Sequence, residues 1–399
     1  MTAPVVRART VSAARAWTIL AVGVLAQTAT TALVAAPALL LPVLHQRQHL
    51  PLPVAGLIAG APNLGLVLTL VAWGWAADRF GERVVLVSGL AATTVLGGLA
   101  ALPAGPAVFG LLLLAAGAAS ACANAASGRV VVGWFPKERR GLAMGIRQMC
   151  QPLGVTIAAL TVPQLGAAAG LGTAVLPPTA LCAAAAVLCL FVIIDPPRGV
   201  RTAVTGRNPY RGDGYLWRIH AVSALLVVPQ FTLSTFGLVW LVAGLGWQVL
   251  PAGLLVGAAQ LAGAIGRLLV GALSDRAASR IGPLRIVAVA ALAVMVLLAI
   301  AAGLLPAAAA VVYVIAATVS VADNGLAFTA VAEGAGSHWA GRALGVQNTG
   351  QFLAAAGVGP LVGALIGWLG YPLAFLVVAL TPAAAIPLVP ATAAERDRL

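Results

Sequence analysis

Charged residues are scarce in this chain, and this sets the first limit on its fold class. Only 8% of its 399 residues are charged, whereas a soluble domain carries about 25%. Hydrophobic residues make up 61% of the chain, and its mean hydropathy is +1.02. Such a chain cannot cover its apolar surface in water. A soluble globular fold is therefore excluded, and a membrane protein is expected.

Acidic residues are the rarer charged class, with 10 Asp and Glu against 23 Lys and Arg, so the formal net charge is +13. A basic excess can indicate a nucleic-acid partner. Here, however, a cytosolic N-terminus would place every basic loop residue except Arg47 in the cytosol. This is the positive-inside bias of membrane proteins. We therefore expect cytosolic N- and C-termini, contact with a lipid bilayer, and no nucleic-acid partner.

Cysteine and histidine are also few, with four of each. No two cysteines have the spacing of a metal site, and all four lie inside apolar runs, where small buried residues are expected. The histidines have no recognisable triad or metal partner, and no glycine-rich phosphate loop follows a strand. The sequence therefore indicates no enzyme, no metal site and no cofactor.

Long apolar runs are what the chain has in abundance. A helix needs about 20 apolar residues to cross a membrane core of ~30 Å, and twelve runs reach that length, six in each half. A segment rich in Pro, Gly and Arg separates the halves. We predict an all-α membrane protein of twelve transmembrane helices in two pseudo-symmetric six-helix bundles, residues 1–194 and 219–399, joined by a cytosolic linker, residues 195–218. The predicted spans are Trp17–Val43, Val54–Ala77, Val84–Ala101, Ala107–Trp134, Leu142–Ala168, Thr173–Ile194, Ile219–Ala243, Leu250–Gly271, Leu284–Leu304, Ala307–Ala332, Ala343–Gly367 and Leu373–Val389.

One charged pattern occurs once in each half, between two apolar runs. Its aspartates, Asp78 and Asp275, are 275 − 78 = 197 residues apart. Other matches recur at similar offsets, and a chain that repeats itself at half its length contains two related halves. The positions of the pattern are Gly74, Asp78, Arg79, Gly81 and Arg83 in the first half and Gly271, Asp275 and Arg276 in the second.

This Gly-x-x-x-Asp-Arg-x-Gly-x-Arg pattern resembles the signature loop of the major facilitator superfamily, and the resemblance covers nearly the whole chain. It implies transport by alternating access, with a loop that braces the two halves when the transporter faces outward. Each Asp ends a span near the N-terminal ends of spans five and eleven, where a helix dipole stabilises a carboxylate by about 0.3–1 kcal/mol. A weaker role is expected for Asp275, because Ala278 replaces the second Gly there. The alternative is a generic charged turn at the membrane border.

Amide side chains inside the spans fall in matched pairs across the repeat. Polar groups are costly in lipid and face the protein interior. The paired amides avoid spans three, six, nine and twelve, and in the family resembled the other spans line or flank the central cavity. We interpret the set as a polar cavity, with interhelical hydrogen bonding as the alternative. The pairs are Gln27 with Gln230, Asn63 with Gln260, Asn124 with Asn324, and Gln151 with Gln351.

Asp323 breaks this symmetry, because its repeat partner is Ala123. It is the one acid deep inside a predicted span, about 16 residues or ~24 Å from the outer end. A carboxyl group that exchanges a proton there can couple transport to a proton gradient. The lactose permease branch of the superfamily also has an essential carboxylate in span ten. The alternative is a structural ion pair with Arg267 or Arg129.

Arg147 lies one helical turn before Gln151 and has Gln347 as its repeat partner. An Arg fork in a cavity favours a carboxylate or another anion; snorkelling toward the membrane surface is the alternative. The stretch Trp134–Gly141 resembles the span four–five loop of several anion permeases, including cyanate and nitrate carriers. Drug/proton antiporters usually carry Gly-Pro-x-Gly-Gly in span five, where this chain has Gln-Pro-Leu-Gly from Gln151.

These observations predict a monomeric, multi-pass protein of the cytoplasmic (inner) membrane. We expect a secondary transporter that moves a small anionic organic solute together with H+ by alternating access. One alternative is a drug or metabolite/proton antiporter of the same fold. The other is a non-transporting membrane sensor or scaffold, which would need neither paired amides nor the Asp-Arg loop. The predicted substrate-binding residues are Gln27, Asn124, Arg147, Gln151, Gln230, Asn324 and Gln351.

Overall fold

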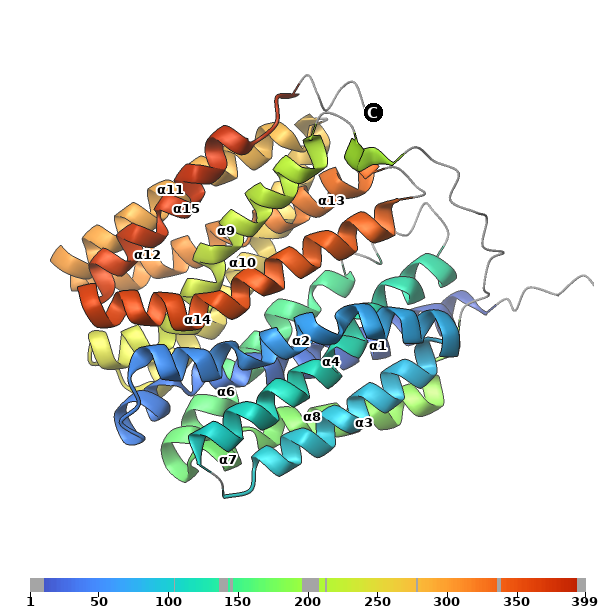
Figure 1. Cartoon of the computed structure of the whole chain (residues 1–399), viewed down its shortest axis with the longest axis horizontal. Coiled ribbons are helices and arrows are strands. Elements are labelled where there is room, and N and C mark those ends of the chain that lie inside the picture. Colours follow the sequence, from blue (N-terminus) through green and yellow to red (C-terminus); the bar gives the residue numbers. More distant parts are fainter. Residues whose placement is uncertain are drawn as a thin grey trace, which may run out of the picture.

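A computed structural model describes residues 11–103, 105–135, 143, 146–195, 208–211, 214–277, 279–335 and 339–392. Within these ranges the side chains of residues 78, 127–133, 275, 306, 307, 340 and 341 are outside the description. Most of the predicted linker, residues 196–207, 212 and 213, is outside it as well. The described residues form helices and no strands, as the apolar runs predict (Figure 1).

The helices of the first half follow the predicted spans. They are α1 (Ala13–Leu39), which continues into the π-helix η1 (Val43–Arg47), α2 (Leu52–Phe80), α3 (Glu82–Ala100), α4 (Pro106–Trp134), α6 (Cys150–Ala169), α7 (Leu171–Ala174) and α8 (Leu176–Val192).

The second half begins with the short 3-10 helix η2 (Pro209–Arg211) in the linker. Its helices are α9 (Tyr215–Val239), which continues into η3 (Trp240–Gly244), α10 (Val249–Ala277), α11 (Ile281–Leu304), α12 (Pro306–Val319), α13 (Asp323–Ala335), α14 (Ala340–Val378), α15 (Leu380–Ala385) and η4 (Ile386–Leu388).

The twelve predicted spans are confirmed. Among the described residues, eleven helical segments are long and apolar enough to cross a membrane. The last of these, Arg342–Leu388, holds two spans, because the chain leaves helical geometry at Gly370 with φ 75° and ψ 170°. Glycine tolerates this positive φ since it has no Cβ. The protein is therefore a multi-pass, all-helical membrane protein.

One predicted span is interrupted. The tenth, Ala307–Ala332, is divided into α12 and α13 by a turn at Ser320–Ala322. A break at membrane depth frees backbone groups that need new partners inside the protein. It also makes Asp323 the first residue of α13 rather than a residue in the middle of a helix.

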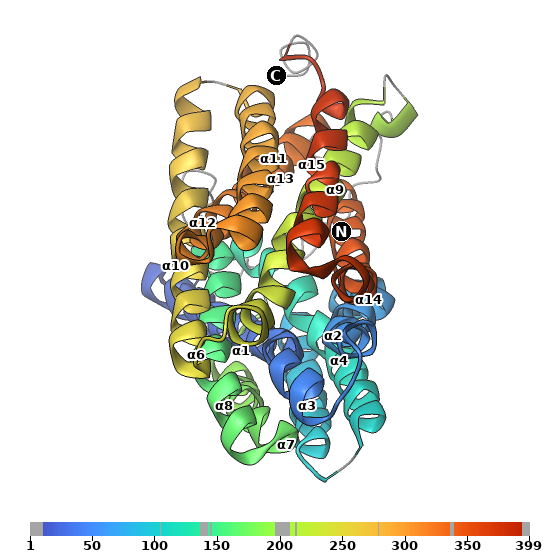
Figure 2. The same cartoon turned by 90° about the vertical axis from the view of Figure 1, so that its left-hand side faces the viewer.

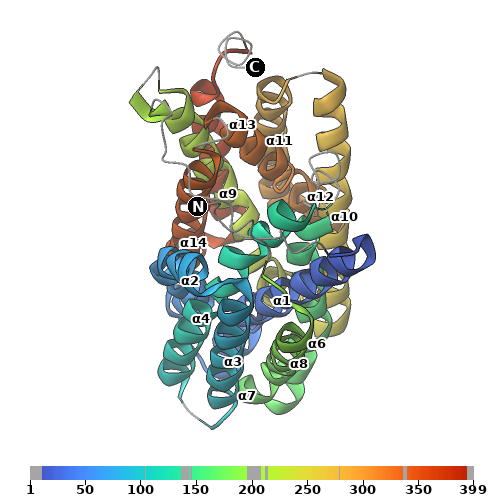
Figure 3. The same cartoon turned by 90° about the vertical axis from the view of Figure 1, so that its right-hand side faces the viewer.

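The helices before and after the linker form two groups, which lie one below the other in the end-on views (Figures 2 and 3). The first group holds α1 to α8 and the second holds α9 to α15. The main contacts between them are made by α2 with α14 and by α6 with α10. Figure 1 shows α2 and α14 diverging toward one end of the molecule.

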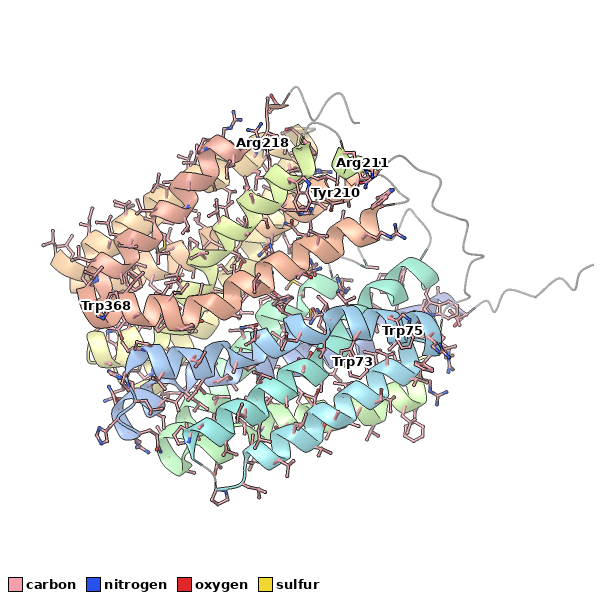
Figure 4. All side chains as sticks on the ribbon, viewed as in Figure 1. Trp73, Trp75, Tyr210, Arg211, Arg218 and Trp368 are labelled. Carbon is pink, nitrogen blue, oxygen red and sulfur yellow. The ribbon has the colours of Figure 1, made fainter. Side chains whose placement is uncertain are left out.

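The two ends of the molecule are named here for what lies on them. The terminal face is the end where α1 begins, α2 ends and η2 lies, and the opposite face is the end with η1 and the start of α2 (Figure 1). Figure 4 places Tyr210, Arg211 and Arg218 at the terminal face and Trp368 at the opposite face. Trp75 and Trp368, near opposite ends of the helices, are 58% and 83% exposed, as is typical of tryptophans at the two membrane–water interfaces.

Candidate functional site

A cavity of about 100 Å³ lies between the two groups of helices. Helices α1, α2, α4 and α6 of the first half line it, together with α9, α10 and α14 of the second. Phe231 and Phe352 contribute aromatic surface, and Arg267 contributes the positive charge of the lining. The amides on the wall are Asn63, Asn124, Gln151, Gln230 and Gln260, and the hydroxyl groups are Thr30, Thr31, Ser120, Ser234 and Thr235.

In the second half, the predicted amides form one hydrogen-bonded chain behind this wall. The Nε2 of Gln351 donates to Ser223 Oγ at 2.7 Å and to Asn324 Oδ1 at 2.9 Å. The Nδ2 of Asn324 then donates to Oε1 of Gln230 at 2.8 Å. Because Gln230 lies on the cavity wall, this chain fixes the orientation of an amide that a solute can meet.

In the first half, the repeat partners of Gln230 and Asn324 are also bonded to each other. The Nε2 of Gln27 donates to Asn124 Oδ1 at 3.0 Å. The donor and acceptor roles are exchanged relative to the second half. Of the predicted binding residues, Asn124, Gln151 and Gln230 lie on the wall. Gln27 and Asn324 each form a hydrogen bond with one of these wall residues. Gln351 reaches the wall through Asn324.

Arg147 is not part of this wall. It lies one turn before Gln151 and is half-buried, but the cavity lining begins at Gln151 on that helix. Its predicted role as an anion ligand therefore stays a prediction.

Asp323 is buried behind the wall, with 1% of its surface exposed. Neither carboxylate oxygen has a hydrogen-bond partner among the described residues. Arg267 is close enough to interact with it electrostatically. Both residues are described and no direct ion pair joins them, so the alternative of a structural pair with Arg267 is not what the geometry favours. The side chain of Arg129, the other predicted partner, lies outside the described residues.

Arg267 is the site residue that the sequence analysis missed, since it was considered there only as a partner for Asp323. Its Nε donates to the backbone oxygen of Val321 at 3.1 Å, a carbonyl in the break between α12 and α13. The lack of an equivalent residue in the other half, which singled out Asp323, could also have identified Arg267. At the offset of 197, the repeat partner of Arg267 is Leu70, so the charge has no counterpart in the other half.

The signature loop is described in part. Gly81 has φ 96° and packs against Asp195, whose Oδ1 accepts from the backbone N–H of Arg83 at 2.8 Å. The guanidinium of Arg83 also donates to the carbonyl of Leu190 at 2.5 Å. In this structure the end of the loop is therefore fastened to the end of α8 within the first half.

The second copy of the loop is fastened in its own half as well. Arg280, which matches Arg83 at the offset of 197, lies 3.5 Å from Oε1 of Glu333 on α13 and donates to Ser274 Oγ at 2.9 Å. Arg79 packs its guanidinium over the rings of Trp75 and Phe80. Gly74, Gly271 and Arg276 lie on α2 and α10 near the terminal face, and the side chains of Asp78 and Asp275 are outside the described residues.

Glycines bring the two groups of helices together near the opposite face. On α2 and α14, a Cβ added to Gly56 or Gly359 would overlap the other's backbone carbonyl. On α10 and α6, a Cβ added to Gly253 would lie 2.7 Å from the carbonyl oxygen of Ala159. These contacts are repeat copies, since 56 + 197 = 253 and 159 + 200 = 359. The close contacts thus lie near the starts of α2 and α10, on one side of the cavity.

Comparison with known proteins agrees with this architecture. The family model described as "Major Facilitator Superfamily" matches residues 19–357. Two curated relatives, "Uncharacterized MFS-type transporter Rv2994" of Mycobacterium tuberculosis (strain ATCC 25618 / H37Rv) and "Uncharacterized MFS-type transporter MT3072" of strain CDC 1551 / Oshkosh, are each 45% identical over 356 residues. Each alignment covers 88% of this chain and 80% of the relative.

Solved structures share the fold at low sequence identity. A bacterial homolog of the human lysosomal transporter Spinster, in an inward-facing and unoccupied conformation, matches with a TM-score of 0.78 and 16% identity, covering 97% of this chain and 98% of its own. A D-xylose-proton symporter matches with a TM-score of 0.77 and 16% identity, covering 94% and 98%. The family model spans most of the chain, and the chain therefore belongs to the Major Facilitator Superfamily of transporters.

Proposed function

We propose that this protein is a proton-coupled secondary transporter of the cytoplasmic membrane that moves a small anionic organic solute by alternating access. The observation that carries the proposal is the cavity between the two halves. Amide and hydroxyl groups from both halves line it, the guanidinium of Arg267 reaches it, and behind it lies a buried carboxyl group that has no hydrogen-bond partner in the described part of the chain.

The size and chemistry of the cavity favour a small polar solute over a drug-sized one. Its volume is about 100 Å³, whereas pockets for drug-sized ligands are roughly 300–1,000 Å³. Arg267 is the charged residue among the described residues of the lining, and a guanidinium inside a membrane protein favours an anion. The resemblance of Trp134–Gly141 to the span four–five loop of cyanate and nitrate carriers also favours an anionic solute. Residues 136–141 lie outside the described residues.

The basic residues support the proposed orientation in the membrane. Among the described residues, Arg79, Arg83, Arg211, Arg218 and Arg342 lie at or near the terminal face, which the positive-inside bias assigns to the cytosol. The glycine contacts near the opposite face would then close the cavity from outside. This supports an inward-facing conformation, the state of the Spinster homolog that shares the fold.

Asp323 is the proposed proton carrier. An ionised carboxylate without hydrogen-bond partners is costly to bury, and ionisable groups inside membrane helices commonly form proton relays. The fold is shared with a sugar-proton symporter, so it is compatible with proton coupling.

The substrate class is tested first, by thermal stabilisation of the purified protein. The panel contains acetate, lactate, cyanate, nitrate and hydrophobic cations. We expect selective stabilisation by one or more of the anions. Selective stabilisation by hydrophobic cations would instead support the drug or metabolite/proton antiporter. Binding without any uptake or exchange in proteoliposomes would support the sensor or scaffold.

Proton coupling is tested with Asp323→Asn in proteoliposomes loaded with the anion that stabilises the protein. The Asn side chain mimics the protonated acid, so the variant should exchange the anion across the membrane. It should lose accumulation driven by a pH gradient, because it has no proton to release. Glu333→Gln, on the same helix but near the terminal face, is the matched control. It loses the contact with Arg280 of the second signature loop, so its rate can change, but it should still accumulate the anion in response to the pH gradient. Normal gradient-driven accumulation by Asp323→Asn would exclude Asp323 as the proton carrier.

A further inference from the structure

We infer that Arg267 binds the negative group of the solute in competition with Asp323, so that one proton and one monoanion cross the membrane together with no net charge at the site. This inference rests on the proposed function and adds to it the anion ligand, the chemical class of the solute and the charge balance of the cycle. The argument starts from the break between α12 and α13.

The turn between α12 and α13 holds Arg267 by a hydrogen bond on the Nε side of its guanidinium. The Nε of Arg267 donates to the carbonyl of Val321 at 3.1 Å, in the turn that separates the two helices. The Nη1 and Nη2 groups make no hydrogen bond or ion pair with the described part of the chain. A guanidinium has five N–H donors, and the two outer groups suit the two oxygens of a carboxylate. Because Arg267 lines the cavity, these donors are available to a solute there.

The same break places Asp323 at the start of α13, within electrostatic reach of Arg267 but not in contact with it. Helix α13 packs against α9, α10, α11 and α14. Several charged and titratable groups of these helices near the terminal face are engaged elsewhere: Arg218 donates to the carbonyl of Leu388, His220 bonds to Gln347, and Arg285 donates to the carbonyl of Pro390. Arg342 packs over the ring of Trp339, and Arg276 lies at the end of α10, more than two turns beyond Arg267. Among the described residues, Arg267 is the charge that acts on Asp323, and the Cys150 thiol on α6 is the further titratable group that acts on Arg267.

The net charge at Arg267 and Asp323 couples the binding of the proton to the binding of the anion. With Asp323 ionised and the cavity empty, the pair is neutral, since Arg267 is positive. With Asp323 protonated and a monoanion on Arg267, the site is neutral again. Binding only the proton leaves a net charge of +1, and binding only the anion leaves −1. Net charge is costly inside a membrane, so each ligand favours binding of the other, and this coupling is reciprocal. The proton resides on an Asp323 oxygen, and no covalent bond to the solute forms.

The first test measures binding by purified full-length protein. Acetate and lactate are the probes, and acetamide and lactamide are their uncharged counterparts. Arg267→Gln should weaken anion binding by about 100-fold, and Arg267→Lys by about tenfold, because a point charge does not reproduce the planar fork. Neither variant should change the binding of acetamide or lactamide. Arg342→Gln, an exposed arginine at the terminal face, should bind as wild type does.

The second test measures protons. In weakly buffered detergent solution, the wild type should take up about one proton for each anion bound, and its anion affinity should fall about tenfold per pH unit at alkaline pH. Asp323→Asn should bind the anion with no proton uptake and no pH dependence. In proteoliposomes, uptake by the wild type should respond to a pH gradient and not to a potassium-diffusion potential.

The outcomes separate this inference from the proposed function. Proton-driven anion uptake that survives Arg267→Lys and Arg267→Gln unchanged would overturn the role of Arg267 and leave the proposed function standing. Uptake driven by membrane potential would overturn the neutral charge balance alone. A wild type that binds none of the anions, or transports none, would overturn both. The lysine variant keeps the positive charge, so it remains informative if the glutamine variant fails to fold.

Discussion

At the scale of single residues, the equivalent asparagines Asn124 and Asn324 have different numbers of hydrogen-bond partners among the described residues. Asn324 bonds to both Gln230 and Gln351, whereas Asn124 has its described bond to Gln27. Buried polar groups that lose a partner destabilise a protein by about 1–3 kcal/mol each. The repeat therefore offers a matched comparison between two asparagines in equivalent positions.

We predict that Asn324→Ala lowers the melting temperature of the purified protein more than Asn124→Ala does. The first change leaves both Gln230 and Gln351 short of a partner, while the second removes the described bond to Gln27. Asn324→Ala should also weaken anion binding, because Gln230 on the cavity wall is no longer held. Differential scanning fluorimetry in detergent compares the two variants. Equal losses of stability would show that the second-half chain of amides does not act as a connected unit.

Sequence reasoning at this scale found residue types and pairs but not contacts. Asn124, Gln151 and Gln230 lie on the cavity wall, and their role in binding a solute stays a prediction. Arg267 was missed, because the sequence does not reveal that its Nε bonds to a carbonyl freed by a break elsewhere. Such contacts depend on how helices distant in the chain pack together, and one sequence does not contain that geometry.

At the scale of elements, the spans could be predicted closely because lipid allows few alternatives. A segment inside the bilayer must satisfy its backbone hydrogen bonds internally, so a long apolar run becomes a helix. The break at Ser320–Ala322 was not predictable in the same way. No Pro or Gly marks these three residues, and the turn is supported by a side chain from α10.

The glycine contacts between α2 and α14 lead to a prediction about opening. Gly359→Ala adds a Cβ that would overlap the carbonyl of Gly56, and backbone cannot move aside as a flexible side chain can. We expect the two helices to separate near the opposite face, which makes the cavity more accessible from that side. The measurement is the labelling rate of a cysteine at Thr31, on the cavity wall, by an impermeant maleimide applied from outside.

Gly367→Ala is the matched control for this experiment. It lies on the same helix, and a Cβ added there would meet no atom within 4 Å. Its labelling rate should equal that of the unsubstituted reporter. Should Gly359→Ala label no faster than Gly367→Ala, the glycine contact would not be what closes the cavity on that side.

At the scale of the whole molecule, the repeat gives the protein two related halves, and two charges near the cavity that have no counterpart in the first half lie in the second. Asp323 and Arg267 have Ala123 and Leu70 as partners. The paired amides of both halves thus line the cavity wall or support it by hydrogen bonds, and the asymmetric pair supplies the coupling proposed here. Sequence alone could predict this division, but not which end of the cavity is closed, because closure depends on contacts between helices that are distant in the chain, such as those of Gly56 with Gly359.

The signature loops should set the balance between the two conformations. Asp78 lies in the last turn of α2, at the terminal face. Helix α14, which contains the eleventh span, begins at that face. When the halves close there, a carboxylate against a helix N-terminus contributes about 0.3–1 kcal/mol. That is too little to decide folding, but it changes the ratio of two conformations by roughly twofold to fivefold.

We therefore predict that Asp78→Asn leaves the melting temperature nearly unchanged, favours the conformation closed at the opposite face, and slows transport. Asp275→Asn should have the same effect to a smaller degree, because Ala278 interrupts the second copy of the pattern. Labelling of the Thr31 cysteine from outside should fall in both variants, by more for Asp78→Asn. Wild-type labelling together with a wild-type transport rate in Asp78→Asn would mean that the duplicated loop does not control closure, and that its recurrence reflects only a charged turn at the membrane border.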